Sequence, residues 1–229
     1  MTCVIMQPSF LPWLGFFDLI RKADVFVIYD HVQFEKQSWQ QRNRIRNKQG
    51  EIMLIMPVRH NDGLKRRIKD VEIDFSRDIF RKHLNSIQLS YSKAKNFDIV
   101  YPSLETIYLK RYKYLIDLNI SLIKLGMEFL SINKEFRFSS EMDVQGCKVE
   151  ALIDVCKKVN ADHYLSPRGS KQYIDKNNLF PSYNIQLEYQ SFNHPVYMQV
   201  NYGDFISHLS FIDYLFNVEI EKAQSFGLD

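Results

Sequence analysis

The sequence predicts an α/β protein built on a doubly wound, mostly parallel sheet with helices on both faces. Short apolar runs typical of buried strands recur along the chain, and segments with apolar residues at helical spacing separate them. The run Cys3–Met6, the helical segment Leu14–Ala23 and the run Asp24–Tyr29 form a strand–helix–strand unit. Its two strands should be parallel and its crossover right-handed. The 229 residues predict one α/β domain over 1–229, with a helical segment around 77–126 as a candidate subdomain.

Apolar runs and helical spacing also predict the remaining elements. Ser38–Asn47 is polar and is expected to be partly helical, with Trp39 as its apolar anchor. Further strands are expected at Ile52–Pro57, Lys69–Ile73, Glu128–Ser131, His163–Ser166 and Ile185–Tyr189. Further helices are expected at Arg77–Leu89, Ile99–Leu109, Tyr112–Leu125, Lys148–Lys158, Lys171–Asp175 and Ser210–Asn217. Helices and strands thus alternate through the whole chain, as in a doubly wound sheet.

Composition excludes several classes of protein. The net charge of +3, from 30 basic and 27 acidic residues, is too balanced to indicate a nucleic-acid-binding face. The three cysteines have no framework spacing, which fits a reducing compartment. A strand expected at residue 3 leaves no room for a signal peptide, and no apolar run reaches the ~20 residues of a bilayer span, so we expect a cytoplasmic protein without a transmembrane segment.

The known motifs of several large enzyme classes are absent from the sequence. There is no Walker loop, no G-x-G-x-x-G, no H-E-x-x-H and no G-x-S-x-G. The six histidines lack tight metal-ligand spacing, so no metal and no cofactor are expected.

Polar loops follow several of the expected strands, and in doubly wound sheets ligands bind beyond the carboxyl ends of the strands. Four such loops could converge on one rim: Gln7–Phe10, Asp30–Phe34, His60–Lys65 and Ser166–Gly169. After the first of these loops, Gly15 would let the following helix start close to a neighbour or a ligand, and the N-terminus of that helix would suit a diphosphate. A rigid connection without a ligand is the alternative.

The candidate catalytic residues are Asp30, His31 and His194. Asp30 at a strand end could hold an amine or polarise a histidine, and a neutral imidazole of His31 or His194 could accept a proton from an attacking group. A surface or hydrogen-bonding role is the alternative for both histidines. The candidate substrate-binding residues are Gln7, Phe10, Gln33, Lys36, Trp39, Arg42, Asn43, Ser166, Gly169 and Tyr173. Among them, Arg42 with Lys36 could bind phosphate, and Gln33 or Asn43 could donate to an oxyanion.

The stretch Ile5–Ile45 contains Met6-Gln7-Pro8, Pro12, Gly15-Phe16-Phe17, Asp24, Phe26-Val27, Tyr29-Asp30, Val32-Gln33-Phe34, Lys36, Trp39 and Arg42-Asn43-Arg44-Ile45. In these residues it resembles the WbqC-like family. The resemblance resumes at Pro57-Val58, Ser139-Ser140, Tyr164-Leu165-Ser166, Gly169, Tyr173, Tyr197, Gln199, Phe205, Leu209–Asp213 and Asn217. Two positions depart from the family pattern: His31 stands where a second acidic residue is usual, and Pro167 where Gly is common.

The resemblance implies a role in making the unusual sugars of bacterial surface polysaccharides of the O-antigen type. Our leading hypothesis is transfer of an acyl or aminoacyl group from a thioester donor, such as an acyl carrier protein, to the amine of a nucleotide-linked amino sugar. Trp13-Leu14-Gly15-Phe16 is also similar in layout to the H-x-G-H segment of nucleotidylyl transferases, although Trp13 and Phe16 replace its histidines. Nucleotidylyl transfer, and a non-catalytic binding or assembly protein of the polysaccharide machinery, are the alternatives.

Overall fold

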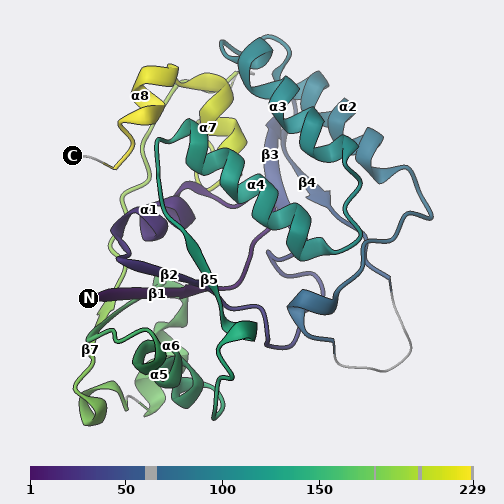
Figure 1. Ribbon diagram of the computed structural model, residues 1–229. Helices are drawn as coiled ribbons and strands as arrows, with labels where there is room; N and C mark the ends of the chain where they lie inside the picture. Colours follow the sequence, from purple (N-terminus) through teal and green to yellow (C-terminus); the bar gives the residue numbers. More distant parts are fainter. Residues whose placement is uncertain (60–65, 178, 201–202, 228–229) are drawn as a thin grey trace. The chain divides into compact units, whose positions relative to one another are not determined.

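The computed structural model describes residues 1–59, 66–177, 179–200 and 203–227 (Figure 1). The chain forms two compact units, each assembled from separate stretches of sequence. Unit 1 comprises Met1–Gln7, Asp18–Val32 and Lys134–Asn193, and unit 2 comprises Pro8–Phe17, Gln33–Asn133 and His194–Asp229. The expected loop His60–Lys65 lies outside the described residues. The expected helical segment 77–126 falls within unit 2, and its status as a subdomain stays a prediction.

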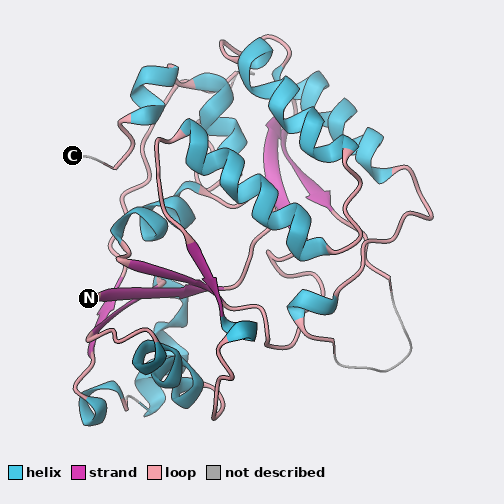
Figure 2. Ribbon diagram, viewed as in Figure 1, coloured by secondary structure: helices cyan, strands magenta, loops and turns pink. Residues whose placement is uncertain are grey.

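Unit 1 is built on a five-stranded sheet in the order β5-β2-β1-β6-β7 (Figure 2). The strands are β1 Thr2–Met6, β2 Val25–Ile28, β5 Phe136–Phe138, β6 His163–Ser166 and β7 Gln186–Tyr189. Every neighbouring pair is parallel. The chain adds strands to one side of β1 and then to the other, so the strand order reverses between β1 and β6, as in a Rossmann-like sheet. The predicted fold class is therefore confirmed.

A helix covers one face of this sheet. Helix α5, Val149–Lys158, buries Val149, Leu152 and Val155 in a core that also contains Ile5 and Val27 of the sheet. The strands β1 and β2 are continuous apolar runs without alternation, which is typical of strands buried on both faces. Helix α1, Leu14–Lys22, and the short α6, Lys171–Ile174, follow β1 and β6 in the chain. Short 3-10 helices complete the connections at Ser139–Glu141, Arg168–Ser170, Asp175–Asn177 and Phe180–Tyr183.

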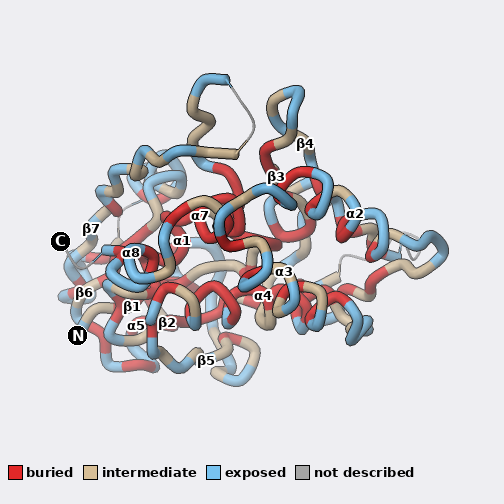
Figure 3. The backbone as a smooth tube through the Cα atoms, turned by 90° about the horizontal axis from the view of Figure 1, so that it is seen from above, coloured by how far each residue is buried: buried red, intermediate tan, exposed pale blue. Residues whose placement is uncertain are grey.

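Unit 2 contains most of the helices and a two-stranded antiparallel hairpin. Its helices are α2 Ile79–Tyr91, α3 Phe97–Leu109, α4 Leu115–Phe129, α7 Phe211–Asn217 and α8 Ile220–Gln224, with a 3-10 turn at Ile68–Asp70. The hairpin joins β3, Arg42–Asn47, to β4, Gly50–Ile55. Helix α7 is buried over all but its last residue (Figure 3). Helices α2, α3 and α4 follow one another without a strand of the parallel sheet, so the expected alternation through the whole chain is wrong.

Three element predictions were wrong for physical reasons. Ser38–Asn47 is not helical, because Asn43 and Ile45 are buried while Arg42 and Arg44 are only half-buried, which is the period of a strand. Glu128–Ser131 is the end of α4 instead of a strand, since a short apolar run fits either element. Lys69–Ile73 forms the 3-10 turn Ile68–Asp70 followed by isolated bridges, not a continuous strand.

Candidate functional site

The carboxyl ends of four parallel strands bring polar residues to one edge of the unit 1 sheet. Met6 of β1 pairs with Ile28 of β2, and Ile28 pairs with Phe138 of β5, so these three strands end level with one another (Figure 1). The residues that follow are Gln7 after β1, Asp30 and His31 after β2, Ser139 and Ser140 after β5, and Pro167–Gly169 after β6. Four of these, Asp30, His31, Ser139 and Ser140, are joined by hydrogen bonds and are called the Asp30 cluster below.

The carboxylate of Asp30 is held by neutral donors. Asp30 is 2% exposed, and its Oδ1 accepts hydrogen bonds from Ser139 Oγ at 3.0 Å and from the backbone N–H of Ser140 at 2.8 Å. Its Oδ2 accepts from Ser140 Oγ at 2.7 Å. A buried carboxylate needs such donors, because burial without them is costly. Asp30 therefore fixes the two serines against the end of β2 and has little surface with which to hold a substrate amine.

His31 is tied to the same cluster through one ring nitrogen. Its Nδ1 lies 2.7 Å from Ser139 Oγ, which also accepts the backbone N–H of Asp30 at 3.0 Å. The Tyr29 ring meets the imidazole edge-on, with centroids 4.8 Å apart at 82°. The imidazole is thus held on one edge by a hydrogen bond and by an aromatic neighbour, and it is half-buried at the end of β2.

Two tyrosines and a cysteine belong to the same unit. Burial raises the pKa of Tyr29 to about 12, and the neighbouring Tyr173 and Cys147 contribute further. The pKa of Tyr173 is raised by burial and by Cys147. Both phenols therefore stay protonated near neutral pH. Tyr173 is 42% exposed, which leaves part of its ring available to a ligand.

The other predicted residues of this edge differ in exposure. Ser166 is fully buried, and its carbonyl accepts the backbone N–H of Gln190 at 2.8 Å, so it extends the pairing of β6. Gly169 is exposed, and no atom lies within 4 Å of the position that a Cβ would take. Packing therefore does not require glycine there. Gln7 is half-buried directly after β1.

Two predicted binding residues, Phe10 and Asn43, lie in the interior of unit 2. Phe10 is fully buried, and its ring lies 5.9 Å from that of His83. Asn43 is 4% exposed and donates to the carbonyls of Leu11 at 2.7 Å and Phe10 at 3.3 Å. Asn43 thus satisfies carbonyls of the loop between β1 and α1 that have no strand partner. These two residues shape their segment and do not form a surface.

Trp39 is exposed, contrary to the expectation that it anchors its segment. It is 50% exposed, and the guanidinium groups of Arg42 and Arg44 lie 6.0 and 5.7 Å from its ring centroid. Arg44 also pairs with Glu51 at 3.0 Å. We call Trp39, Arg42 and Arg44 the Trp39 surface of unit 2. Gln33 and Lys36 are exposed in the same unit.

His194 is packed among aromatic rings of unit 2. It stacks on Trp13, with centroids 6.5 Å apart at 8°, and its Nδ1 donates to the carbonyl of Pro195 at 2.9 Å. Burial lowers the pKa of His194, so the neutral ring is favoured. Trp13 in turn lies against Gly15, where a Cβ would come within 2.2 Å of the indole. The indole of Trp13 therefore packs against the first turn of α1, and the expectation that a diphosphate binds at this helix N-terminus stays a prediction.

A buried polar network that the sequence did not reveal surrounds Asp213. Its carboxylate accepts hydrogen bonds from Tyr91 at 2.7 Å, Tyr197 at 2.8 Å and Gln199 at 2.7 Å, and Arg46 donates to Gln199 at 2.8 Å. Burial raises the pKa of Asp213. Tyr197, Gln199 and Asp213 belong to the pattern that resembles the family, and in this structure they hold α7 in place. The match of these three residues to the family pattern therefore reflects a structural role.

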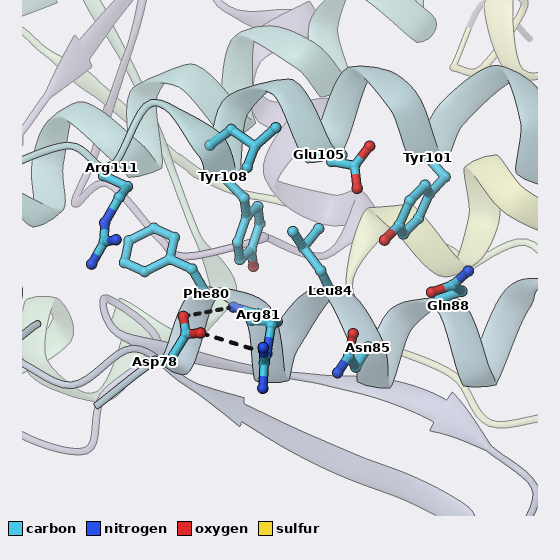
Figure 4. Close-up of a pocket in the computed structure, with 11 residues that line it drawn as sticks. Asp78, Phe80, Arg81, Leu84, Asn85, Gln88, Tyr101, Glu105, Tyr108 and Arg111 are labelled. Carbon is cyan, nitrogen blue, oxygen red and sulfur yellow. Dashed lines mark hydrogen bonds and ion pairs between the residues drawn. The ribbon is translucent and has the colours of Figure 1, made fainter.

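A groove of about 370 Å³ lies between α2 and α3 of unit 2 (Figure 4). Arg81, Leu84 and Asn85 line it from α2, and Tyr101, Glu105 and Tyr108 from α3. None of the predicted site residues belongs to it. His83 of α2 does not line the groove; it is buried, and desolvation lowers its pKa to about 4.

Two broader features concern membranes and metals. Within the described ranges, none of the helices combines the length and apolar character that a bilayer span requires. Across the same ranges, no three His, Cys, Asp or Glu side chains gather as a metal site.

Comparison with known proteins places the chain in a family. The model of the WbqC-like protein family matches residues 7–225. The uncharacterized protein Rv1507c of Mycobacterium tuberculosis is 31% identical over 219 residues, which are 95% of this chain and 94% of that protein. No solved structure matches. Because the match covers most of the chain and includes residues of both units, the chain belongs to the WbqC-like protein family.

Proposed function

We propose that this protein is a transferase that moves an acyl or aminoacyl group from a thioester to the amine of a nucleotide-linked amino sugar, in the synthesis of bacterial surface polysaccharide. The observation that carries the proposal is the imidazole of His31, held by Ser139 at the carboxyl edge of a parallel sheet. Ligands of doubly wound sheets bind at that edge. The resemblance to the family supports the polysaccharide context.

The proposed reaction needs a base more than it needs a nucleophile on the protein. The sugar amine attacks the thioester carbonyl, the new C–N bond forms, and the C–S bond breaks. The amine loses a proton to His31, and the leaving thiolate takes up a proton to become the free thiol. Asp30 is assigned a supporting part, since its carboxylate already accepts hydrogen bonds from both serines.

The remaining predicted contacts fall into two groups. Gln7, Gly169 and the half-exposed Tyr173 stand at or near the sheet edge and are proposed to contact the sugar. Gln33, Lys36 and the Trp39 surface belong to unit 2, where the indole offers a stacking face and the guanidinium of Arg42 a charge that suits phosphate, and their part in binding stays a prediction. The proposed site does not include Phe10 and Asn43, which are buried in unit 2, or His194, which stacks on Trp13 in that unit.

Nucleotidylyl transfer is not favoured. The two positions that carry histidines in the H-x-G-H segment are occupied by Trp13, which packs on Gly15, and by Phe16, which is 1% exposed. Neither side chain can stabilise a transferring phosphate.

The test is incubation with a panel of nucleotide-linked amino sugars and acyl or aminoacyl thioesters, with products read by mass spectrometry. One sugar should gain a fixed acyl mass. His31→Gln should lower the rate by ~10²- to 10⁴-fold, the usual contribution of a general base. His163→Gln is the matched control, because His163 begins β6, away from the carboxyl ends of the strands, and its Nδ1 contacts Thr2 Oγ1. Mass gain that is equally fast in both variants would refute the role of His31. Release of pyrophosphate without acyl transfer would refute the reaction itself.

A further inference from the structure

Ser139 Oγ sits among three groups that together determine where its proton goes. The backbone N–H of Asp30 lies at 3.0 Å and can only donate. Asp30 Oδ1 lies at 3.0 Å and, in the carboxylate form, can only accept. His31 Nδ1 lies at 2.7 Å and can do either, depending on the tautomer. A serine hydroxyl has one proton and can accept two hydrogen bonds.

Only one arrangement satisfies all three contacts. If the hydroxyl donates to Asp30, it accepts from the Asp30 amide and from a protonated Nδ1 of His31. If the hydroxyl instead donates to His31, the oxygen of Ser139 faces the carboxylate oxygen at 3.0 Å with no proton between them. Two acceptors in contact are unfavourable in a site where Asp30 is 2% and Ser139 is 1% exposed.

We infer that Asp30 and Ser139 are positioning residues that keep a proton on Nδ1 of His31, so that Nε2 is the ring nitrogen that gains and loses protons. This inference rests on the proposed function only where the proton that Nε2 accepts is taken to come from a substrate amine. The orientation of the ring follows from the cluster alone. The edge-on contact with Tyr29 restrains rotation of the imidazole, so the Nδ1 hydrogen bond sets the direction of Nε2.

The cluster provides its own matched control. Ser140 donates to the same carboxylate, at 2.8 Å from its amide and 2.7 Å from its hydroxyl, and neither of these bonds involves His31. Ser139→Ala removes the acceptor of Nδ1. Ser140→Ala removes one donor to Asp30 and leaves the contact between Ser139 and His31 in place.

The experiment is ¹⁵N NMR of the imidazole rings in the full-length protein labelled at histidine. The His31 signals are identified by their loss in His31→Gln, since the chain has six histidines. In the neutral imidazole of the wild type, Nδ1 should give the signal of a protonated nitrogen and Nε2 that of an unprotonated one. Ser140→Ala should preserve this pattern, and Ser139→Ala should lose it, with the proton moving to Nε2 or being shared.

Two results would overturn the inference. One is a wild-type ring with its neutral-state proton on Nε2, which is decisive even if a variant does not fold. The other is a Ser139→Ala ring that keeps the wild-type pattern in a folded protein. Neither measurement uses a substrate, so loss of the proposed reaction leaves this result unaffected. Conversely, a confirmed tautomer together with no transfer would discard the reaction alone.

Discussion

Lowering the pH from 7.5 to 5 should weaken unit 2 through a single buried histidine. His83 of α2 is 3% exposed, and the hydroxyl of Tyr108 lies 3.4 Å from its Nδ1. Desolvation lowers its pKa from the ordinary 6.5 to about 4, while a hydrogen bond to the backbone of Ile55 partly opposes this. The unfolded chain therefore takes up a proton on this ring below pH 6.5, and the folded chain does so only near pH 4. In this interval the proton favours unfolding.

The magnitude follows from the two pKa values. At ~1.36 kcal/mol per pH unit, the full difference costs about 3 kcal/mol once the pH is below both pKa values. About 2 kcal/mol of it should already be lost at pH 5. That is a large part of the ~5–15 kcal/mol by which domains are usually stable.

The assay is urea unfolding at pH 7.5 and pH 5, followed by tryptophan fluorescence. Trp13 and Trp39, the two tryptophans of the chain, both belong to unit 2, so their emission reports this unit. His83→Gln keeps a donor and an acceptor but cannot titrate. The difference in unfolding free energy between the two pH values should be about 2 kcal/mol smaller in His83→Gln than in the wild type.

The other titrating groups are common to both proteins, so their contributions to the change in unfolding free energy cancel in this comparison. Equal losses in the wild type and in His83→Gln would show that His83 is not the group responsible. A directly measured pKa of His83 near 6.5 in the folded protein would refute the reasoning as well. Any loss of stability from the substitution itself does not matter, because only the change with pH is compared.

Two further substitutions test packing and buried polarity, each by urea unfolding. Gly126→Ala should cost ~1–3 kcal/mol through overpacking, because its Cβ would lie 2.3 Å from a phenylalanine ring. Gly169→Ala, where nothing lies within 4 Å, is the matched control and should change stability little; similar effects of the two would contradict the packing argument. Asp213→Ala leaves three donors without their acceptor, the buried Tyr91 and the half-buried Tyr197 and Gln199, and should cost ~3–5 kcal/mol, more than Asp213→Asn, which retains one oxygen; equal losses would show that the carboxylate is not their common partner.

The sequence predicted an element correctly where its hydrophobic pattern fitted only a helix or only a strand. The β1 and β2 runs are continuous and apolar, with an amphipathic segment between them, so the parallel unit could be predicted. The hairpin could not, because the alternation of Arg42–Asn47 is hidden among polar residues of both faces. Arg46 even faces inward, at 2% exposure, where its guanidinium donates to Gln199 and to the carbonyl of Asp204. A long-range partner of this kind leaves no local signal.

The candidate site was predictable in part for the same reason. Asp30 and His31 follow a strand that the sequence identifies, so their place at a sheet edge could be inferred. Ser139 and Ser140 follow β5, a strand of three residues that falls outside the predicted strand at Glu128–Ser131. Their bonds to Asp30 span 109 and 110 residues. Phe10 and Asn43 were misjudged because residue type alone does not separate an amide that binds a ligand from one that binds loop carbonyls.

The strand order also constrains the size of a substrate for unit 1. The Asp30 cluster stands at β2 and β5, whereas the reversal of strand order lies between β1 and β6, where Gln7 and Ser166 are found. Neighbouring strands lie ~4.8 Å apart, so β2 and β6 are separated by about 10 Å across β1. A ligand that reaches His31 and also occupies the crevice at the reversal must span this distance. A single sugar ring is too short to do so, and a sugar carrying a diphosphate is long enough. If the proposed acceptor contacts both His31 and the crevice, it must therefore be longer than a single sugar ring.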